Sequence, residues 1–573
     1  MRLWTWLRPF FCDDGLFWAT GKYLHIARDK IRRALACLTA WCKETGFKFS
    51  VPKTYYIVFT RKRVRRDPVM FLCGSPITRQ YHTKYLGMTF DSSLTWRLHI
   101  LDLVERCKKP LALMRMIAGK RWGGDRQSLT LLYTSLIRSK IDYGSFLYAT
   151  AADCHLIKVN RIQYAAIRII TGLMRCTPVG NLEAEANILP LHLRRDQLML
   201  QYFGRVLRLE NHPVTHLFNN FYNFAFYSSR PYALPVVGRA KELLTSSNMP
   251  LDNLEQIPLA DLHFIGVPAV RYNLLANKKH FTNIQFRLQF HSLQDTLYSD
   301  YVPVFTDGSK MDGRTSFAFV VLDTVVAHRL PSSSSIFTAE LYAIYRAVKH
   351  ISLSDWVRVV IFSDSLSALQ AIDSFSPKSH YMLKLQKLLA LCDKEIVLEW
   401  VPAHVGIHGN DLADAAAKAA IQDDVVISIK LLYSDLRVLI RHFIFQCWQT
   451  NWSLSRCWLR RLKPILGDWK SAYRECRREE IVLSRLRAGT CLFMVQHRFD
   501  TSIPRDLCPS CDVYTNVFHI LVRCPRLTVH RTGILAHLSA NNLSQSVNNI
   551  LGDDFPFSVL FTFLRNVAYF NRV

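Results

Sequence analysis

The stretch Val302-Pro-Val-Phe-Thr-Asp-Gly-Ser-Lys310 predicts a β-strand that ends at an acidic residue, Asp307. A second apolar run, Val357-Arg-Val-Val-Ile-Phe-Ser363, ends in the same way at Asp364. In open α/β sheets, ligands collect at the carboxyl ends of the strands. Both aspartates are therefore expected to lie at one cleft, where they are well placed for chemistry.

Two further carboxylates fall on predicted helices. Glu340 lies early in residues 338–349, where apolar side chains recur at helical spacing. Asp414 lies in the alanine-rich segment 409–418, which opens just after a glycine. Taken singly, each acidic residue is more simply explained as a turn, N-cap or solvated residue. Taken together, the carboxylates repel one another unless cations neutralise them, and hard oxygen ligands suit Mg²⁺.

Short motifs containing these carboxylates follow one another within residues 300–422. They are Thr306-Asp-Gly-Ser309, Thr338-Ala-Glu340, Ser363-Asp-Ser365, Val401-Pro-Ala-His-Val-Gly406 and Gly409-Asn-Asp-Leu-Ala-Asp414. In this order they closely resemble a type 1 ribonuclease H domain. The departure is Asp411, where relatives more often carry glutamate, but that position is not a metal ligand.

The resemblance implies a catalytic site and a reaction. Asp307, Glu340, Asp364 and Asp414 are implied to hold two Mg²⁺ ions and to cleave the RNA strand of an RNA–DNA hybrid. Two such Mg²⁺ ions, about 3.5–4 Å apart, activate a water molecule and stabilise the leaving oxygen. His404, by itself an ordinary loop histidine, is implied to help proton transfer or product release.

The amino-acid composition indicates what kind of partner the chain binds and in which cellular compartment it occurs. Lys and Arg number 73 against 45 Asp and Glu, which leaves a formal net charge of +28 and predicts a nucleic-acid partner. An anionic membrane surface is the competing explanation, but no apolar stretch of roughly 18 residues supports insertion.

No signal peptide is predicted at the N-terminus. Arg8 interrupts the apolar run there, and Asp13-Asp14 follow where a small-residue cleavage site should lie. The 15 scattered cysteines suit an intracellular protein, with nucleus and cytoplasm not distinguished.

The front of the chain carries Phe10-Phe-Cys-Asp-Asp14, followed by the segments 46–54 and 85–90. Together they resemble the second half of a reverse transcriptase palm from a jockey-like non-LTR retrotransposon. The resemblance implies that Asp13 and Asp14 belong to a polymerase Mg²⁺ site. The family's earlier metal-binding aspartate and its fingers should precede Phe11, where only ten residues stand. Asp13 and Asp14 are therefore expected to be a vestigial half-site, and polymerase activity is expected only if the chain is a fragment of a longer gene product.

Residues 92–230 are predicted to be helical, with basic side chains between the apolar ones. A thumb that grips phosphates and a merely solvated helix surface explain this pattern equally well. The basic run 61–66 reads as an exposed hairpin tip that binds phosphate or directs nuclear import. Residues 231–298, with prolines, serines and weak periodicity, are expected to be a linker.

The tail holds a ligand-type spacing, C-x2-C-x7-H-x4-C, formed by Cys508, Cys511, His519 and Cys524. A Cys₃His set suits a structural, closed Zn²⁺ site. The alternative is unrelated buried thiols, since free cysteine behaves as a small hydrophobe. The tail also resembles the cysteine–histidine segment that ends jockey-type polyproteins, which implies contact with template nucleic acid.

The sequence as a whole predicts a multidomain α/β and α protein. The expected function is two-metal endonucleolytic hydrolysis of RNA in RNA–DNA hybrids, within a truncated retrotransposon polyprotein. The alternative is a catalytically lapsed nucleic-acid-binding relic or domesticated scaffold, and protein partners are not predicted. The expected domains are a partial palm (1–91), a helical thumb and connection (92–230), a linker (231–298), a ribonuclease H-like mixed sheet with flanking helices (299–424) and a helical C-terminal module with a small metal site (425–573).

Overall fold

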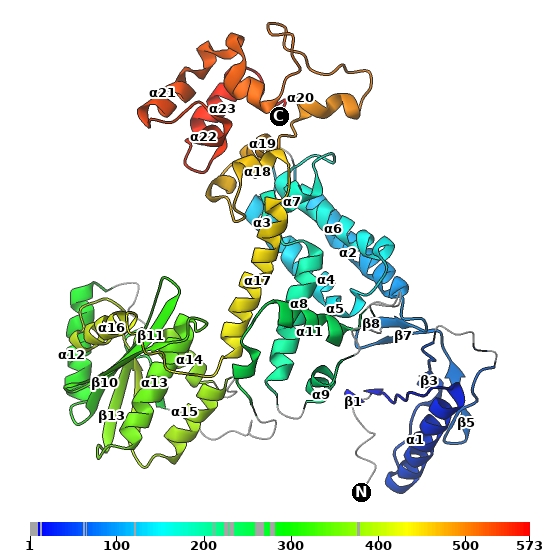
Figure 1. Cartoon of the computed structure of the whole chain (residues 1–573), viewed down its shortest axis with the longest axis vertical. Helices are drawn as coiled ribbons and strands as arrows, with labels where there is room; N and C mark the ends of the chain where they lie inside the picture. The colour runs from blue at the N-terminus through cyan, green and yellow to red at the C-terminus, as the bar shows by residue number, and fades with distance from the viewer. Residues whose placement is uncertain are drawn as a thin grey trace. The chain divides into compact units, whose positions relative to one another are not determined.

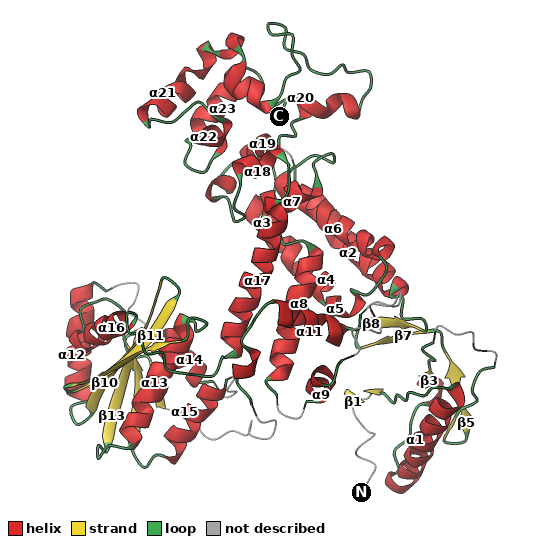
Figure 2. Cartoon of the chain, in the orientation of Figure 1, coloured by secondary structure: helices red, strands yellow, loops and turns green. Residues whose placement is uncertain are grey.

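A computed structural model divides the chain into two compact units, one formed by residues 1–191 and 455–573 and the other by residues 192–454 (Figure 1). Helices predominate, and the largest described sheet lies in the second unit (Figure 2). None of the described helices has the length and apolar character needed to cross a membrane. The structure describes all residues except 1–9, 12–13, 61–63, 65, 120–121, 210–211, 223–226, 228–233, 258–268, 276–280 and 375–378, and the side chains of 10, 11 and 14.

Six strands of the second unit form a mixed sheet in the order β12-β11-β10-β13-β14-β9 within the described residues. The strands β12, β11 and β10 are antiparallel neighbours, whereas β10, β13, β14 and β9 run parallel. Residues 359–363 of β13 are all buried, so both faces of this central strand are covered. The predicted mixed sheet is thus confirmed. Its strands are β9 (Ala269–Arg271), β10 (Val302–Met311), β11 (Arg314–Val321), β12 (Thr324–Leu330), β13 (Arg358–Ser363) and β14 (Glu395–Trp400).

Helices cover this sheet and share its core. Helix α13 begins after Ser335, whose Oγ accepts a hydrogen bond from the Thr338 N–H at 3.3 Å. Its side chains Leu341, Ile344 and Val348 are buried in the core, which confirms the helix predicted around Glu340. Helices α13 and α16 both contact β10 and β11. The helices of this part are α12 (Asn283–Leu297), α13 (Ile336–Ser352), α14 (Leu366–Ile372), α15 (His380–Leu391) and α16 (His408–Ala420).

The segment 231–298, expected to be a linker, contributes regular structure in its described residues. Strand β9 pairs with β14, and α12 buries Phe286 and Phe290 in the core of the sheet. The ring centroid of Phe290 lies 5.0 Å from that of Phe362 in β13. A three-residue strand such as β9 is too short to show a periodicity in the sequence. Its pairing is decided by the neighbouring strand and not by its own residues.

Other helices of the second unit meet at a buried carboxylate. Glu255 accepts hydrogen bonds from the backbone N–H of His380, at 2.8 Å, and of Tyr433, at 3.0 Å. It thereby pairs one backbone N–H at the start of each of α15 and α17, where the first turn of a helix has no partner within the helix. Because α17 belongs to this unit, the predicted module 425–573 is divided between the two units. These further helices are α8 (Leu191–Leu207), α9 (Pro213–Asn219), α11 (Val236–Ser246) and α17 (Tyr433–Ser453).

The first unit opens with short strand pairs and the long helix α1 (Leu24–Thr45). Strands β1 and β2 pair antiparallel, with Phe11 opposite Asp14. Asp13 and the side chain of Asp14 lie outside the described residues, as does most of the basic run 61–66. The strands are β1 (Phe10–Phe11), β2 (Asp14–Gly15), β3 (Tyr55–Tyr56), β4 (Phe71–Leu72), β5 (Ser75–Pro76), β6 (Thr78–Arg79), β7 (His82–Tyr85) and β8 (Met88–Asp91).

The described part of residues 92–230, predicted to be helical, is largely helical, and residues 92–191 pack with the tail. The buried helix α19 connects the two through Glu480, which accepts hydrogen bonds from the Arg126 N–H at 3.0 and 3.2 Å. Lys463 donates to the carbonyl of Ala184 at 2.8 Å. These segments, distant in sequence, therefore fold as one unit. Its helices are α2 (Arg97–Ile117), α3 (Arg126–Leu132), α4 (Ser139–Asp142), α5 (Ser145–Tyr148), α6 (Asp153–Thr171), α7 (Val179–Ala186), α18 (Trp458–Leu462), α19 (Arg477–Ala488), α20 (Leu492–Val495), α21 (Thr532–Ala540), α22 (Val547–Leu551) and α23 (Phe557–Asn566).

Candidate active site and Cys/His cluster

Strand register brings Asp307 and Asp364 to neighbouring positions. The expectation that Asp307 ends its strand is wrong in one respect, because β10 continues to Met311 through its antiparallel pairing with β11. Toward β13, however, the pairing stops at Thr306 opposite Ser363. Asp307 and Asp364 are thus the next residues after the last paired position on two parallel strands. The two aspartates predicted from the strand ends are therefore brought side by side at this edge of the sheet.

Glu340 completes a cluster of three carboxylates. One oxygen from each of Asp307, Glu340 and Asp364 lies within 4.8 Å of the others. Asp307 and Glu340 are buried, at 5% and 8% exposure. As far as the chain is described, Glu340 Oε2 has no hydrogen-bond partner. A buried carboxylate oxygen without a partner is costly, and a bound cation removes that cost. The donors fit a hard divalent ion such as Mg²⁺.

Asp414 and His404 stand beside this cluster and not in it. Asp414 Oδ2 lies 2.7 Å from Lys418 Nζ on the next turn of α16. His404 Nδ1 lies 3.8 Å from the same oxygen, and its side chain is 73% exposed. The backbone of His404 is left-handed, with φ of 55°. Of the residues predicted for the nuclease site, three therefore converge closely, while the half-buried Asp414 and the exposed His404 lie beside them.

Burial and mutual repulsion raise the pKa values of the clustered carboxylates. Burial, followed by the charges of Asp364 and Asp414, raises the pKa of Asp307 to about 7. Burial and the charge of Asp307 raise the pKa of Glu340 well above its usual range. Burial also raises the pKa of Asp364, against a hydrogen bond from Asn410. Without cations, the cluster therefore retains protons near neutral pH.

This proton retention predicts a pH dependence of metal binding. Since a protonated carboxyl is a poor ligand, a cation must displace the proton that Asp307 holds below its pKa of about 7. We expect Mg²⁺ affinity to rise with pH below pH 7, by about tenfold per pH unit for each proton that binding displaces. Calorimetric titration of the full chain between about pH 5.5 and 8 measures this. An affinity that stays constant across the acidic part of that range contradicts the prediction.

A glycine allows the close approach that places Glu340. A Cβ built on Gly308 would lie 2.8 Å from the backbone nitrogen of Glu340 and 2.9 Å from Ala339 Cβ. Gly308→Ala must push α13 away from β10, so we expect a loss of roughly 1–3 kcal/mol in stability and weaker metal binding. Thermal unfolding and Mg²⁺ titration test both effects. Gly180→Ala, where a Cβ has open space, is the control, and equal behaviour of the two variants refutes the argument.

Some residues near the cluster were not singled out from sequence. Asn410 is buried and donates from Nδ2 to Asp364 Oδ2 at 3.4 Å. Its position within the motif Gly409–Asp414 was the available signal. Arg287 of α12 approaches the histidine loop so closely that a Cβ on Gly406 would lie 3.2 Å from its Cδ. No local pattern marks Arg287, because its helix precedes the motifs and reaches the loop only through packing.

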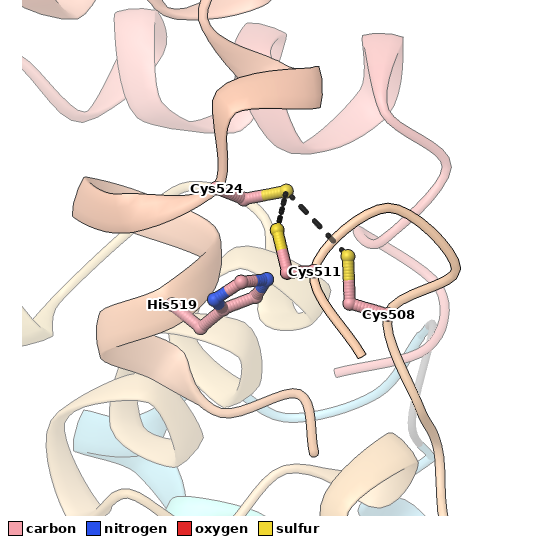
Figure 3. Close-up of side chains that lie close together, drawn as sticks. All are labelled: Cys508, Cys511, His519 and Cys524. Carbon is pink, nitrogen blue, oxygen red and sulfur yellow. Dashed lines mark hydrogen bonds between the residues drawn. The ribbon is translucent and has the colours of Figure 1, made fainter. Parts of the chain in front are cut away.

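The second group of potential ligands lies in the tail. Figure 3 shows Cys508 and Cys511 on one loop, and His519 and Cys524 at a short helical turn, all converging. One ligand atom of each lies within 4.8 Å of the others. Cys524 Sγ is 3.7 Å from Cys508 Sγ and 4.0 Å from Cys511 Sγ. The predicted set of side chains is therefore brought together.

The geometry of this Cys/His cluster fits a tetrahedral metal. With Zn–S bonds of about 2.3 Å, two corners of a tetrahedron lie roughly 3.8 Å apart, close to the separations around Cys524. Burial raises the pKa of Cys508, but hydrogen bonds from His519 and its other neighbours outweigh this and bring it to about 6. The thiolate that a metal requires is thus favoured at Cys508, whereas burial and the neighbouring thiols raise the pKa of Cys511 to about 11. In the described residues, His519 Nε2 is buried without a hydrogen-bond partner.

Comparison with known proteins agrees with the geometry of the carboxylate site. Residues 299–422 match the family model described as RNase H. This range contains Asp307, Glu340, Asp364 and Asp414, and it excludes the Cys/His cluster. The family implies dependence on divalent metal ions and a nucleic-acid substrate.

Several curated relatives come from retroelements of flies. The "Probable RNA-directed DNA polymerase from transposon X-element" of Drosophila melanogaster is 25% identical over 162 residues, which are 28% of this chain and 18% of that protein. The "RNA-directed DNA polymerase from mobile element jockey" of Drosophila funebris is 23% identical over 203 residues, 35% of this chain and 22% of that protein. The matches thus span about a fifth of those relatives. Residues 299–422 therefore form a domain of the RNase H family, in a chain similar to jockey-like non-LTR retrotransposon polyproteins.

Proposed function

We propose that this chain hydrolyses the RNA strand of RNA–DNA hybrids at the carboxylate cluster of its RNase H domain. The observation that carries the proposal is the convergence of Asp307, Glu340 and Asp364 within 4.8 Å from three separate elements. Carboxylates so arranged, buried and with raised pKa values, serve to hold cations. The formal net charge of +28 supports a polyanionic substrate.

The proposed cofactor is a pair of Mg²⁺ ions. When bound, such ions supply an activated water and charge stabilisation for the leaving 3′ oxygen. Asp307, Glu340 and Asp364 provide the hard oxygen donors. Asp414 adds a fourth carboxylate once Lys418, its present partner at 2.7 Å, turns toward solvent or toward a phosphate.

His404 is proposed to handle a proton as the product leaves. Its exposed ring lies where substrate and solvent both have access, and its Nδ1 lies 3.8 Å from Asp414 Oδ2. That carboxylate therefore faces the ring from one side. The exposed position suits transient contact with a departing strand better than permanent metal ligation.

A cleavage assay on the full chain tests the proposal. Hybrids labelled on the RNA or on the DNA strand, single-stranded RNA and duplex DNA are incubated with Mg²⁺ or with chelator. We expect cleavage of the hybrid's RNA strand alone, only with Mg²⁺, and products that end in a 3′ hydroxyl. Binding of the hybrid without cleavage by a well-folded chain supports instead a nucleic-acid-binding relic.

The tail is proposed to hold a structural Zn²⁺ and to contact nucleic acid beside it. Arginine–aromatic pairs flank the Cys/His cluster: Arg505 lies 4.0 Å from the ring centroid of Tyr514, and Arg523 lies 5.1 Å from that of Phe518. Such pairs offer stacking surfaces for bases and charge for phosphates. We also propose that residues 1–91 belong to a partial palm and residues 92–230 to a helical thumb and connection, which the similarity of part of the chain to retroelement polymerases supports.

A further inference from the structure

Helix α17 begins beyond the residues that match the family and sends a carboxylate to the start of α13. Asp435, in the first turn of α17, is 1% exposed. Thr338 Oγ1 lies 2.8 Å from Asp435 Oδ1 and 2.7 Å from Oδ2, and it donates to this carboxylate. Thr338 is itself fully buried. The contact therefore forms in a dry interior, where a charge-assisted hydrogen bond is strong and costly to lose.

The neighbourhood of this contact is the N-terminus of α13. Ser335 is the N-cap, and its Oγ accepts from the Thr338 N–H at 3.3 Å. Lys310 of β10 donates to the carbonyl of Ser334 at 2.7 Å. A carboxylate near a helix N-terminus is favoured by the unpaired N–H groups and by the helix dipole. Asp435 thus holds the first turn of α13 from the side of α17.

Glu340 lies two residues after Thr338 on the same turn of helix. Its backbone packs against Gly308 without room for a Cβ, so a shift of the helix start moves Glu340 relative to Asp307. Among described atoms, its Oε2 has no hydrogen-bond partner, and the hydrogen bond that the carboxylate does receive comes from the Gly308 backbone of β10, so it depends on how α13 lies against that strand. The position of the Glu340 carboxylate is accordingly set by the position of α13, because a packed helix moves as a rigid element.

We propose that Asp435 is a positioning residue for Glu340, so that α17 sets how tightly the carboxylate cluster binds its cations. The inference rests on the proposed function of that cluster as a metal site. It extends the nuclease site past residue 422, where the family match ends. The merely structural alternative is that Asp435 stabilises the fold and leaves the cluster unaffected.

A double-mutant cycle on the full chain separates these roles. Asp435→Ala removes the acceptor, and Thr338→Val removes one of its donors at nearly constant volume, while Ser335 still hydrogen-bonds to the carboxylate through its hydroxyl and its backbone N–H. We expect Asp435→Ala to weaken Mg²⁺ binding about tenfold in calorimetry, Thr338→Val to weaken it by up to that amount, and the double variant to be no weaker than Asp435→Ala alone. Asp435→Asn and Thr338→Ser keep an acceptor and a hydroxyl, so both are expected to bind within about threefold of the unchanged chain. Asp424→Asn, an exposed carboxylate before α17, is the control.

Two results overturn the proposal. One is a lowered unfolding temperature with unchanged Mg²⁺ affinity, which is the signature of a purely structural residue. The other is an additive loss in the double variant, which shows that the two side chains act independently. Failure of the proposed function gives a different result, because Mg²⁺ binding and hybrid cleavage are measured separately. In that case the chain without substitutions binds Mg²⁺ but does not cleave the hybrid, or it binds no Mg²⁺ at all.

Discussion

Asp364→Asn is expected to abolish hybrid cleavage while leaving the fold intact. The substitution keeps the shape of the side chain but replaces a charged ligand by a neutral amide. Metal ions contribute several kcal/mol of charge stabilisation in such reactions, and each 1.36 kcal/mol is tenfold in rate. We therefore expect a loss of at least about a thousandfold in kcat.

Asp364→Asn is expected to leave the fold intact because the carboxylates of the cluster repel one another. Asp364 contributes to the raised pKa of Asp307, so removing its charge relieves the metal-free protein of an unfavourable interaction. The Trp400 Nε1–H donates to the carbonyl of Asp364 at 3.1 Å, a backbone contact that asparagine retains. Cleavage rates and thermal unfolding are measured together.

The control for this variant is Asp355→Asn. Asp355 is an exposed aspartate shortly before β13, in the same domain. It is expected to leave both cleavage and stability unchanged. Undiminished cleavage by a well-folded Asp364→Asn protein removes the assignment of this site as the nuclease centre.

Cys524→Ser is expected to abolish binding of the Zn²⁺ proposed for the tail and to disrupt the cooperative structure of the tail. Cys524 Sγ lies closest to the other sulfurs, at 3.7 and 4.0 Å, so its loss opens the tetrahedron. Structural Zn²⁺ contributes apparent binding energies of about 10–16 kcal/mol in small domains near neutral pH. Elemental analysis is expected to find one Zn²⁺ per unchanged chain and much less in the variant.

The effect is expected to spread beyond the tail. Leu483 and Leu486 of α19 share a core with Cys508 and Cys524, while Glu480 on the same helix binds the Arg126 N–H. Loosening the Cys/His cluster therefore weakens the packing of residues 126–186 as well. Limited proteolysis with and without chelator detects this spread.

The matched control is Cys476→Ser, because Cys476 is an exposed cysteine next to α19. It is expected to retain Zn²⁺ and resist proteolysis like the unchanged chain. An unchanged chain that contains no metal, and whose proteolysis pattern is insensitive to chelator, refutes the zinc assignment.

Much of the carboxylate site follows from local pattern. Asp307 and Asp364 each follow an apolar run, and the parallel register of β10 and β13 makes them neighbours. Glu340 was found through its motif, since helical spacing alone does not distinguish a ligand from a surface glutamate. Asp414 is likewise identified by its motif. Its ion pair with Lys418 forms only once α16 has folded and brought the two side chains onto neighbouring turns.

The sequence by itself determined which chemistry-bearing side chains exist and where along strands and helices they fall. The carboxylates and the C-x2-C-x7-H-x4-C spacing are local features, and local periodicity and turn chemistry place them. Only the tertiary structure decided that β9 and α12 extend the sheet, that α19 joins the tail to residues 126–186, and that Asp435 contacts Thr338. These are contacts between segments far apart in the chain, set by packing and burial, for which no short-range pattern exists.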